Sequence, residues 1–127
     1  MTRYLTTADL TAIAHATMGG KALIRDAGLI DSAAARPMTT MFGAEAYPDL
    51  HEKAAALMHS VLRNHPLIDG NKRLAWVGAR VFLALNGFDF EPDEEAAVEF
   101  VLAAASGESD DVDTVAATLR EWSRRAA

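Results

Sequence analysis

The residues best suited to chemistry lie in one short stretch, His-Pro-Leu-Ile-Asp-Gly-Asn-Lys-Arg, at positions 65–73. It contains a side chain that can act as a general base, His65, and a carboxylate, Asp69, followed by an amide and two cations. The apolar run 74–85 comes next and predicts a helix, whose start presents unpaired N–H groups and a positive dipole to an anion. The stretch therefore has the composition of a phosphate site.

A phosphoryl-transfer site needs a base for the attacking hydroxyl, positive charge at the phosphate oxygens and, as a rule, Mg²⁺. We predict that His65 is the base and that Asp69 binds Mg²⁺ together with the phosphates of ATP. The residues predicted to hold the nucleotide are Gly70, Asn71, Lys72 and Arg73: a glycine that allows close approach, an amide donor, a point charge and a bidentate fork. The predicted catalytic residues are His65, Asp69, Lys72 and Arg73.

The same residues also suit a purely structural turn. In that interpretation Pro66 and Gly70 shape the turn, Asp69 or Asn71 caps the next helix, and the two cations are solvated. Residue types alone leave both interpretations open. A P-loop is excluded, because Lys72 is followed by Arg instead of Ser or Thr and no strand precedes the stretch.

The stretch resembles the signature of the Fic/Doc superfamily, His-x-Phe-x-Asp-Gly/Ala-Asn-x-Arg, and Lys72 before Arg73 places it nearest the Doc (death-on-curing) toxin branch. Further matches occur in the same order at 4–6, 28–32, 35–37, 47–50 and 85–88, so the resemblance spans most of residues 4 to 90. Leu67 replaces the usual Phe and is expected to pin the loop as a smaller apolar peg. Trp76 stands where the adenylylating Fic pattern has a second Arg, which favours Doc.

The resemblance implies a single all-α domain over residues 1–127, a compact bundle of about six helices with the motif loop between two central ones. It also implies a toxin of a toxin-antitoxin pair, an ATP- and Mg²⁺-dependent kinase that phosphorylates a threonine of the translation factor EF-Tu. The chain has no Glu-Gly or Glu-Asn pair, the ending of the Fic inhibitory helix, so restraint is expected from a separate Phd-like antitoxin. Two alternatives stay open: AMP transfer, as in the Fic branch, and an inactive helical interaction module.

Composition narrows the class of protein independently. The chain has 127 residues, 50% of them hydrophobic, which suits one globular domain. It has no cysteine and no continuous apolar span, since Arg80 interrupts the longest run, so we expect a cytoplasmic protein. The net charge of −6 argues against a nucleic-acid partner. Lys72, Arg73 and Arg80 form a cationic group near the motif that suits a small phosphate ligand better than a polynucleotide.

Helical periodicity and end signals predict the scaffold that must position the motif. The expected helices follow a Thr6-x-x-Asp9 capping box and cover about 7–18, 28–36, 49–64, 74–85, 93–105 and 111–125. Trp76 and Arg80 are expected to support Arg73 from the same helix face. Joint metal ligation by His51, His59 and His65 is geometrically poor, because the first two lie about 80° apart on a helix.

Two connecting segments have no helical period. Residues 21–27 carry no clear signal. Residues 38–47 correspond in the Fic/Doc family to a flap that docks the target segment beside the site, and short strands are conceivable only there. A packed connecting loop is the alternative for this segment.

Overall fold

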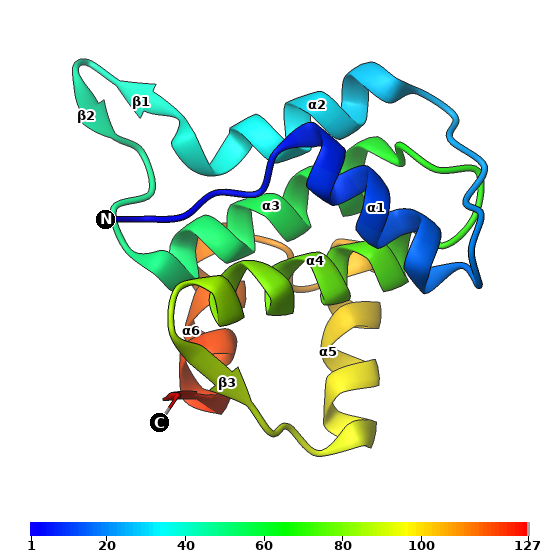
Figure 1. Cartoon of the computed structure of the whole chain (residues 1–127). Helices are drawn as coiled ribbons and strands as arrows, with labels where there is room; N and C mark the ends of the chain where they lie inside the picture. Colours follow the sequence, from blue (N-terminus) through cyan, green and yellow to red (C-terminus); the bar gives the residue numbers. More distant parts are fainter. Residues whose placement is uncertain (127) are drawn as a thin grey trace.

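The computed structural model describes residues 1–126 and consists of helices arranged around a central pair (Figure 1). In chain order the helices are α1 (Thr7–Thr17), α2 (Ala27–Ala35), α3 (Leu50–Asn64), α4 (Asn71–Leu85), α5 (Glu94–Ser106) and α6 (Val112–Trp122), with a 3-10 turn, η1 (Arg36–Met38), after α2. The short strands β1 (Thr40–Met41) and β2 (Ala44–Glu45) form one antiparallel pair, and β3 (Phe88–Phe90) and β4 (Ser123–Arg125) form another. The predicted helical fold is confirmed.

Every described α-helix except α4 begins where a side chain accepts a hydrogen bond from one of its first N–H groups. Thr6 and Asp9 form the predicted capping box of α1: the Thr6 hydroxyl accepts from the Asp9 N–H at 3.0 Å, and the Asp9 carboxylate accepts from the Thr6 N–H at 2.9 Å. Asp49 and Glu52 form a second box at α3. Asp93, the first residue of the predicted helix 93–105, caps α5. The ends of these helices are therefore determined locally.

Helix α4 runs through the middle of the molecule (Figure 1), where it packs against α3, α1 and α5, while α6 packs against α3. A Cβ built on Gly78 would lie 3.3 Å from Leu57 of α3 and 3.4 Å from Leu10 of α1, so the glycine allows both helices to approach closely. On the other side, Trp76 packs against Phe90, Phe100 and Trp122, with ring centroids 5.7 to 6.3 Å away. The predicted central position of this helix is confirmed.

The C-terminal residues differ from the sequence prediction. Helix α6 ends at Trp122 instead of continuing to Arg125, and Ser123 takes an extended conformation, with φ −88° and ψ 153°. Residues 123–125 form β4 and pair with β3, a strand that the sequence did not predict. The Arg125 guanidinium lies 5.1 Å from the centre of the Phe88 ring. Pairing with a remote segment thus replaced the last helical turn.

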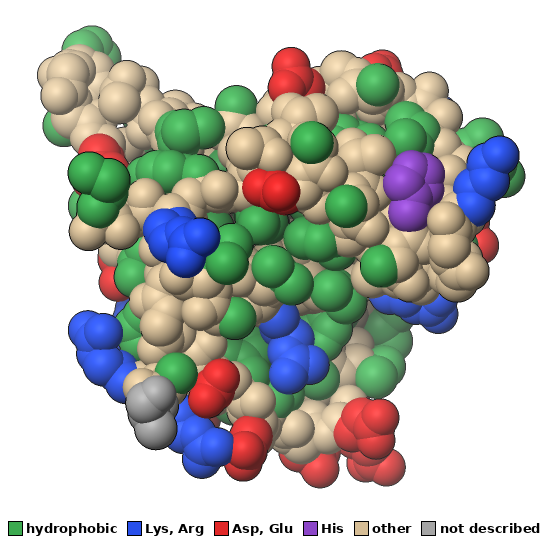
Figure 2. Space-filling view, viewed as in Figure 1, with side chains coloured by type: hydrophobic (Ala, Val, Ile, Leu, Met, Phe, Trp, Pro, Cys, Tyr) green, Lys and Arg blue, Asp and Glu red, His purple; other side chains and the backbone are tan. Residues whose placement is uncertain are grey.

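The segment between α2 and α3 forms a hairpin that projects from the body of the molecule (Figures 1 and 2). Its strands confirm the expected short extended pieces, but it lies at the start of α3, whereas the motif loop follows the end of α3. Helix α3, whose 15 residues make it about 22 Å long, lies between the base of the hairpin and the motif loop. The expectation that residues 38–47 lie beside the site is therefore wrong. A packed loop is also wrong, because Phe42 is fully exposed at the tip.

The base of the hairpin is tied to α3 through a buried lysine. Lys53 is 1% exposed, and its ammonium group donates to the Glu45 carboxylate at 2.9 Å and to the carbonyl of Tyr47. Beside it, the Arg36 guanidinium donates to the Tyr47 hydroxyl at 2.8 Å and to Ser60 at 3.0 Å.

Within residues 1–126 no helix has both the length and the apolar character needed to cross a bilayer.

Candidate active site

The motif loop connects the end of α3 to the start of α4, and both of its ends have left-handed backbone. His65 caps α3 with φ 52° and ψ 64°, an uncommon conformation for a residue with a Cβ. Gly70 precedes α4 with φ 93°. This conformation favours glycine, and a Cβ at Gly70 would also force the flexible Met18 side chain to move, since it would collide with the Met18 sulfur. These two residues make the tight reversal between the central helices.

Leu67 anchors the middle of the loop. Its side chain is 1% exposed, whereas the adjacent Ile68 is 66% exposed. The Asn71 side chain closes the loop over it, accepting the Leu67 N–H at 2.9 Å and donating to the Leu67 carbonyl at 2.8 Å. The predicted apolar peg is confirmed. The amide of Asn71, which the sequence suggested as a phosphate donor, is here bound to the loop itself.

Residues 23–25, which carry no clear secondary-structure signal in the sequence, form backbone hydrogen bonds with the motif loop. Ile24 forms an isolated antiparallel bridge with Leu67, and the Ile68 N–H donates to the Leu23 carbonyl at 3.0 Å. The N–H of Arg25 donates to the Pro66 carbonyl at 2.8 Å. Sequence analysis missed this segment because such pairing has no local pattern. It was assigned only as a connector.

The predicted chemical groups are presented on the outer surface of the braced loop. His65, Asp69, Lys72 and Arg73 are all exposed. The Arg73 guanidinium donates to the carbonyl of Thr17, at the end of α1, at 3.2 Å and lies 3.9 Å from the Met18 sulfur. Among residues 1–126, no hydrogen bond or ion pair within the protein occupies the side chains of Asp69 and Lys72. These two groups are available to a ligand.

The start of α4 has the features of an anion site. Its N-cap, Gly70, has no side chain, and no side-chain hydrogen bond caps the helix. The first N–H groups of α4 therefore point out of the helix without a capping acceptor, at the positive end of the helix dipole. Lys72 and Arg73 add two positive charges in the same turn. Together these groups fit a phosphate chain.

The carboxylate of Asp69 suits Mg²⁺ that arrives with a nucleotide. Within residues 1–126, no group of three or more histidine and acidic side chains could hold a metal ion. A site with one protein carboxylate fits Mg²⁺, which completes its octahedral shell with phosphate oxygens and water. Asp69 is therefore a suitable ligand for the magnesium of a bound nucleoside triphosphate.

The remaining histidines have structural partners instead of a shared ligand. His15 accepts the Ala22 N–H at 3.0 Å, and His51 lies 3.0 Å from the Ser123 hydroxyl. Burial lowers the pKa of His51, and the Arg120 charge lowers it further, against the opposing charge of Asp49. Burial also lowers the pKa of His59. These side chains join helices and termini to one another.

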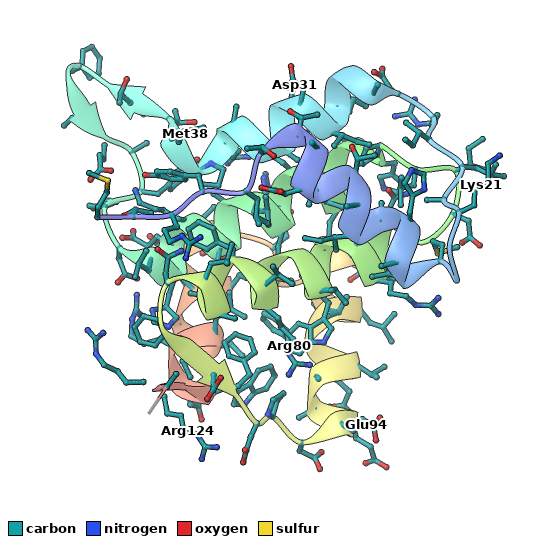
Figure 3. All side chains as sticks on the ribbon, viewed as in Figure 1. Lys21, Asp31, Met38, Arg80, Glu94 and Arg124 are labelled. Atoms are coloured by element: carbon teal, nitrogen blue, oxygen red, sulfur yellow. The ribbon has the colours of Figure 1, made fainter. Side chains whose placement is uncertain are left out.

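Arg80 does not belong to the cationic group at the motif. It lies two turns beyond Arg73, about 10 Å along the helix, and its guanidinium is 5.7 Å from the Trp76 ring and 5.9 Å from the Phe90 ring. Figure 3 shows its side chain in front of α4, toward β3 and α5. Trp76 and Arg80 thus hold α4 to the C-terminal elements.

Two comparisons with known proteins agree with this architecture. A sequence model of the Fic/DOC family matches residues 4–83, which include α1 to α3, the motif loop and most of α4. The chain belongs to the Fic/DOC family. It is 43% identical over 123 residues to a curated protein of Mycolicibacterium smegmatis named Toxin Doc, and the match covers 94% of this chain and 92% of that relative.

Proposed function

We propose that this protein is the toxin of a toxin-antitoxin pair and that it transfers the γ-phosphate of ATP to a threonine of EF-Tu, blocking translation in the cytoplasm. The name of the Mycolicibacterium smegmatis relative supports the toxin role. The observation that supports the kinase activity is the start of α4, which has no side-chain cap, begins six residues after His65 and bears Lys72. It supports the proposal because the imidazole of His65 and the positive charges of Lys72 and Arg73 lie within one short stretch of the chain.

The functional residues of the motif have distinct tasks in this reaction. His65 removes the proton from the threonine hydroxyl, which then attacks the γ-phosphorus while ADP leaves. The first N–H groups of α4 bind phosphate oxygens, and Lys72 and Arg73 neutralise their charge. Mg²⁺, when bound, offsets negative charge on the phosphates, and Asp69 is its protein ligand. Leu67 and Asn71 keep the loop rigid.

Lys72 is the residue that favours phosphate transfer over AMP transfer. In the adenylylating branch the corresponding position usually has glycine, which leaves the backbone bare. An exposed lysine there occupies space and adds a charge, which displaces or reverses the triphosphate and presents its γ-phosphate to the hydroxyl. AMP transfer is the competing activity, and an inactive interaction module is the alternative from another class.

One experiment separates these three functions. The purified protein is incubated with EF-Tu, Mg²⁺ and ATP that is labelled at either the α- or the γ-phosphate, with His65→Ala as the inactive control. We expect label on EF-Tu from the γ-phosphate only, and none with His65→Ala. Label from the α-phosphate indicates AMP transfer. Label from neither position rejects both enzymatic functions and leaves the interaction module.

The biological role has its own test. Expression of the chain alone in bacteria is expected to stop growth, and His65→Ala is expected to relieve the arrest while the variant stays folded. Co-expression of a small Phd-like protein from the neighbouring reading frame is expected to restore growth with the wild-type toxin. Continued arrest with a folded His65→Ala variant contradicts the assignment of His65 as the base.

A further inference from the structure

Arg25 holds three consecutive carbonyl groups where α3 ends and the motif loop begins. Its side chain donates to Asn64 from Nη2 at 2.6 Å and to His65 from Nε at 2.7 Å. Its backbone N–H donates to Pro66 at 2.8 Å. One residue, remote in the sequence, thus fixes the peptide groups on both sides of His65.

These hydrogen bonds act at a residue whose backbone conformation is unfavourable by itself. His65 is one of two non-glycine residues with positive φ within residues 1–126, and Phe42, at the hairpin tip, is the other. Such a backbone persists in a residue with a Cβ only when surrounding contacts impose it. The direction of the imidazole follows from that backbone, because φ and ψ set the direction of the Cα–Cβ bond.

We propose that Arg25 is a positioning residue for the reaction: its guanidinium holds His65 in the left-handed conformation and so aims the imidazole at the reacting hydroxyl. The inference rests on the proposed role of His65 as the base. Arg25 itself touches neither nucleotide nor hydroxyl in this scheme, since both of its side-chain bonds go to backbone carbonyls.

The chemistry of the contact explains why this residue is an arginine. The last carbonyls of a helix lack intrahelical partners and lie at its negative end, where a cation is favourable. A guanidinium has several N–H donors in a fixed plane and can hold two carbonyls at once, whereas the ammonium group of lysine is a point donor on a flexible stem. Arg25 is also exposed, so shortening it leaves no cavity in the core.

The test compares Arg25→Ala and Arg25→Lys with Arg63→Ala as the matched control. Arg63 lies in the last turn of α3, and its guanidinium pairs with Asp110 at 3.0 Å, away from the loop carbonyls. We expect Arg25→Ala to lower kcat by about 10- to 100-fold and to leave KM for ATP within about twofold of wild type. Arg25→Lys is expected to restore part of kcat, and Arg63→Ala to keep all of it.

A second readout does not depend on activity. The Cα and Cβ chemical shifts of His65, measured by NMR, are expected to leave their left-handed values in Arg25→Ala and to lie between in Arg25→Lys, which also serves if the alanine variant does not fold. Unchanged His65 shifts together with an unchanged kcat would overturn the proposal, as would full recovery with lysine. If the wild-type protein transfers no phosphate, the proposed function fails, and the His65 shifts alone decide the role of Arg25.

Discussion

The side chain of Asn71 and the backbone of Leu67 form a reciprocal pair that closes the motif loop: the amide oxygen accepts at 2.9 Å and the amide nitrogen donates at 2.8 Å. Asn86 makes a similar pair at the other end of α4, with the N–H and the carbonyl of Arg3, both at 2.9 Å. One amide thus ties the loop to the start of α4, and the other ties the N-terminal segment to its end.

These two amides give a matched pair of variants. Asn71→Asp and Asn86→Asp each place a carboxylate oxygen against a backbone carbonyl, and each is expected to lower the free energy of unfolding by about 1–3 kcal/mol. Only Asn71→Asp is expected to lower phosphate transfer as well, because only that bond shapes the loop. Urea unfolding and the labelling assay measure the two effects. Equal activity losses in the two variants would contradict a local role for Asn71.

Leu67→Ala is expected to destabilise the fold by about 2–5 kcal/mol, because the side chain is fully buried and its removal leaves a cavity. Its neighbour provides the control: Ile68→Ala, at a position 66% exposed, is expected to change stability by less than about 0.5 kcal/mol. Leu67→Phe tests whether the residue usual in the family raises activity. Similar small losses for both alanine variants in urea titrations would show that the loop has no apolar anchor.

Asp69→Asn is expected to keep the fold and to weaken the use of Mg²⁺-ATP, since Asn is nearly isosteric but has no charge. The measurement is the dependence of phosphate transfer on Mg²⁺ concentration. Glu94→Gln, the loss of one exposed carboxylate at the start of α5, is the control and is expected to behave as wild type. Wild-type Mg²⁺ dependence and turnover in Asp69→Asn would restrict Asp69 to a structural role.

Lys72→Gly is expected to abolish γ-phosphate transfer and to permit some AMP transfer, because glycine restores the bare backbone of the adenylylating branch. Lys72→Arg is expected to keep part of the γ-transfer with poorer geometry. Lys21, an exposed lysine on the side of the molecule where the motif loop lies (Figure 3), provides the control variant Lys21→Ala. Mass spectrometry of EF-Tu identifies the adduct. An undiminished phosphate adduct with Lys72→Gly would show that Lys72 does not select the reaction.

Stability is expected to fall as the pH is lowered from about 7.5 to about 5.5, owing to His51 and His59. Burial lowers the pKa of both, so the folded state keeps them neutral where the unfolded chain, with a histidine pKa near ~6.5, already binds protons. Their contribution is therefore complete above the unfolded pKa and is lost as the pH falls toward the lowered folded values.

The variant His51→Gln isolates one of these two groups. Glutamine can still reach Ser123 but does not titrate, so the slope of the unfolding free energy against pH is expected to decrease by at most about 1.4 kcal/mol per pH unit. The remaining slope includes the contribution of His59. Urea unfolding at several pH values measures both slopes. Identical slopes in wild type and His51→Gln would show that His51 binds protons equally in the folded and unfolded states.

The elements that could be predicted from the sequence are those specified by neighbouring residues. Apolar periodicity located the helices, and Thr6, Asp49, Asp93 and Asp111 marked their starts because a cap bonds to N–H groups two or three residues away. The motif residues and the buried Leu67 were likewise evident from residue types and from the family pattern.

The elements that could not be predicted depend on pairing between remote segments. Ile24 meets Leu67, and β3 meets β4, through backbone hydrogen bonds that carry little side-chain information. The role of Arg25 is hidden for the same reason, since its side chain binds carbonyl groups, which every residue possesses. The hairpin was misplaced because the family resemblance implied a position beside the site, whereas the hairpin precedes α3 and the motif loop follows it.

The hairpin of β1 and β2 also offers a site at which the protein can be labelled. Its tip, at Phe42 and Gly43, is exposed, and its base is bonded to α3, where Lys53 binds Glu45. A chain inserted at such a tip enters solvent without crossing the core. An epitope or a fluorescent domain placed between Phe42 and Gly43 would therefore leave the motif loop, at the opposite end of α3, free to work, and would allow the protein to be followed in living cells.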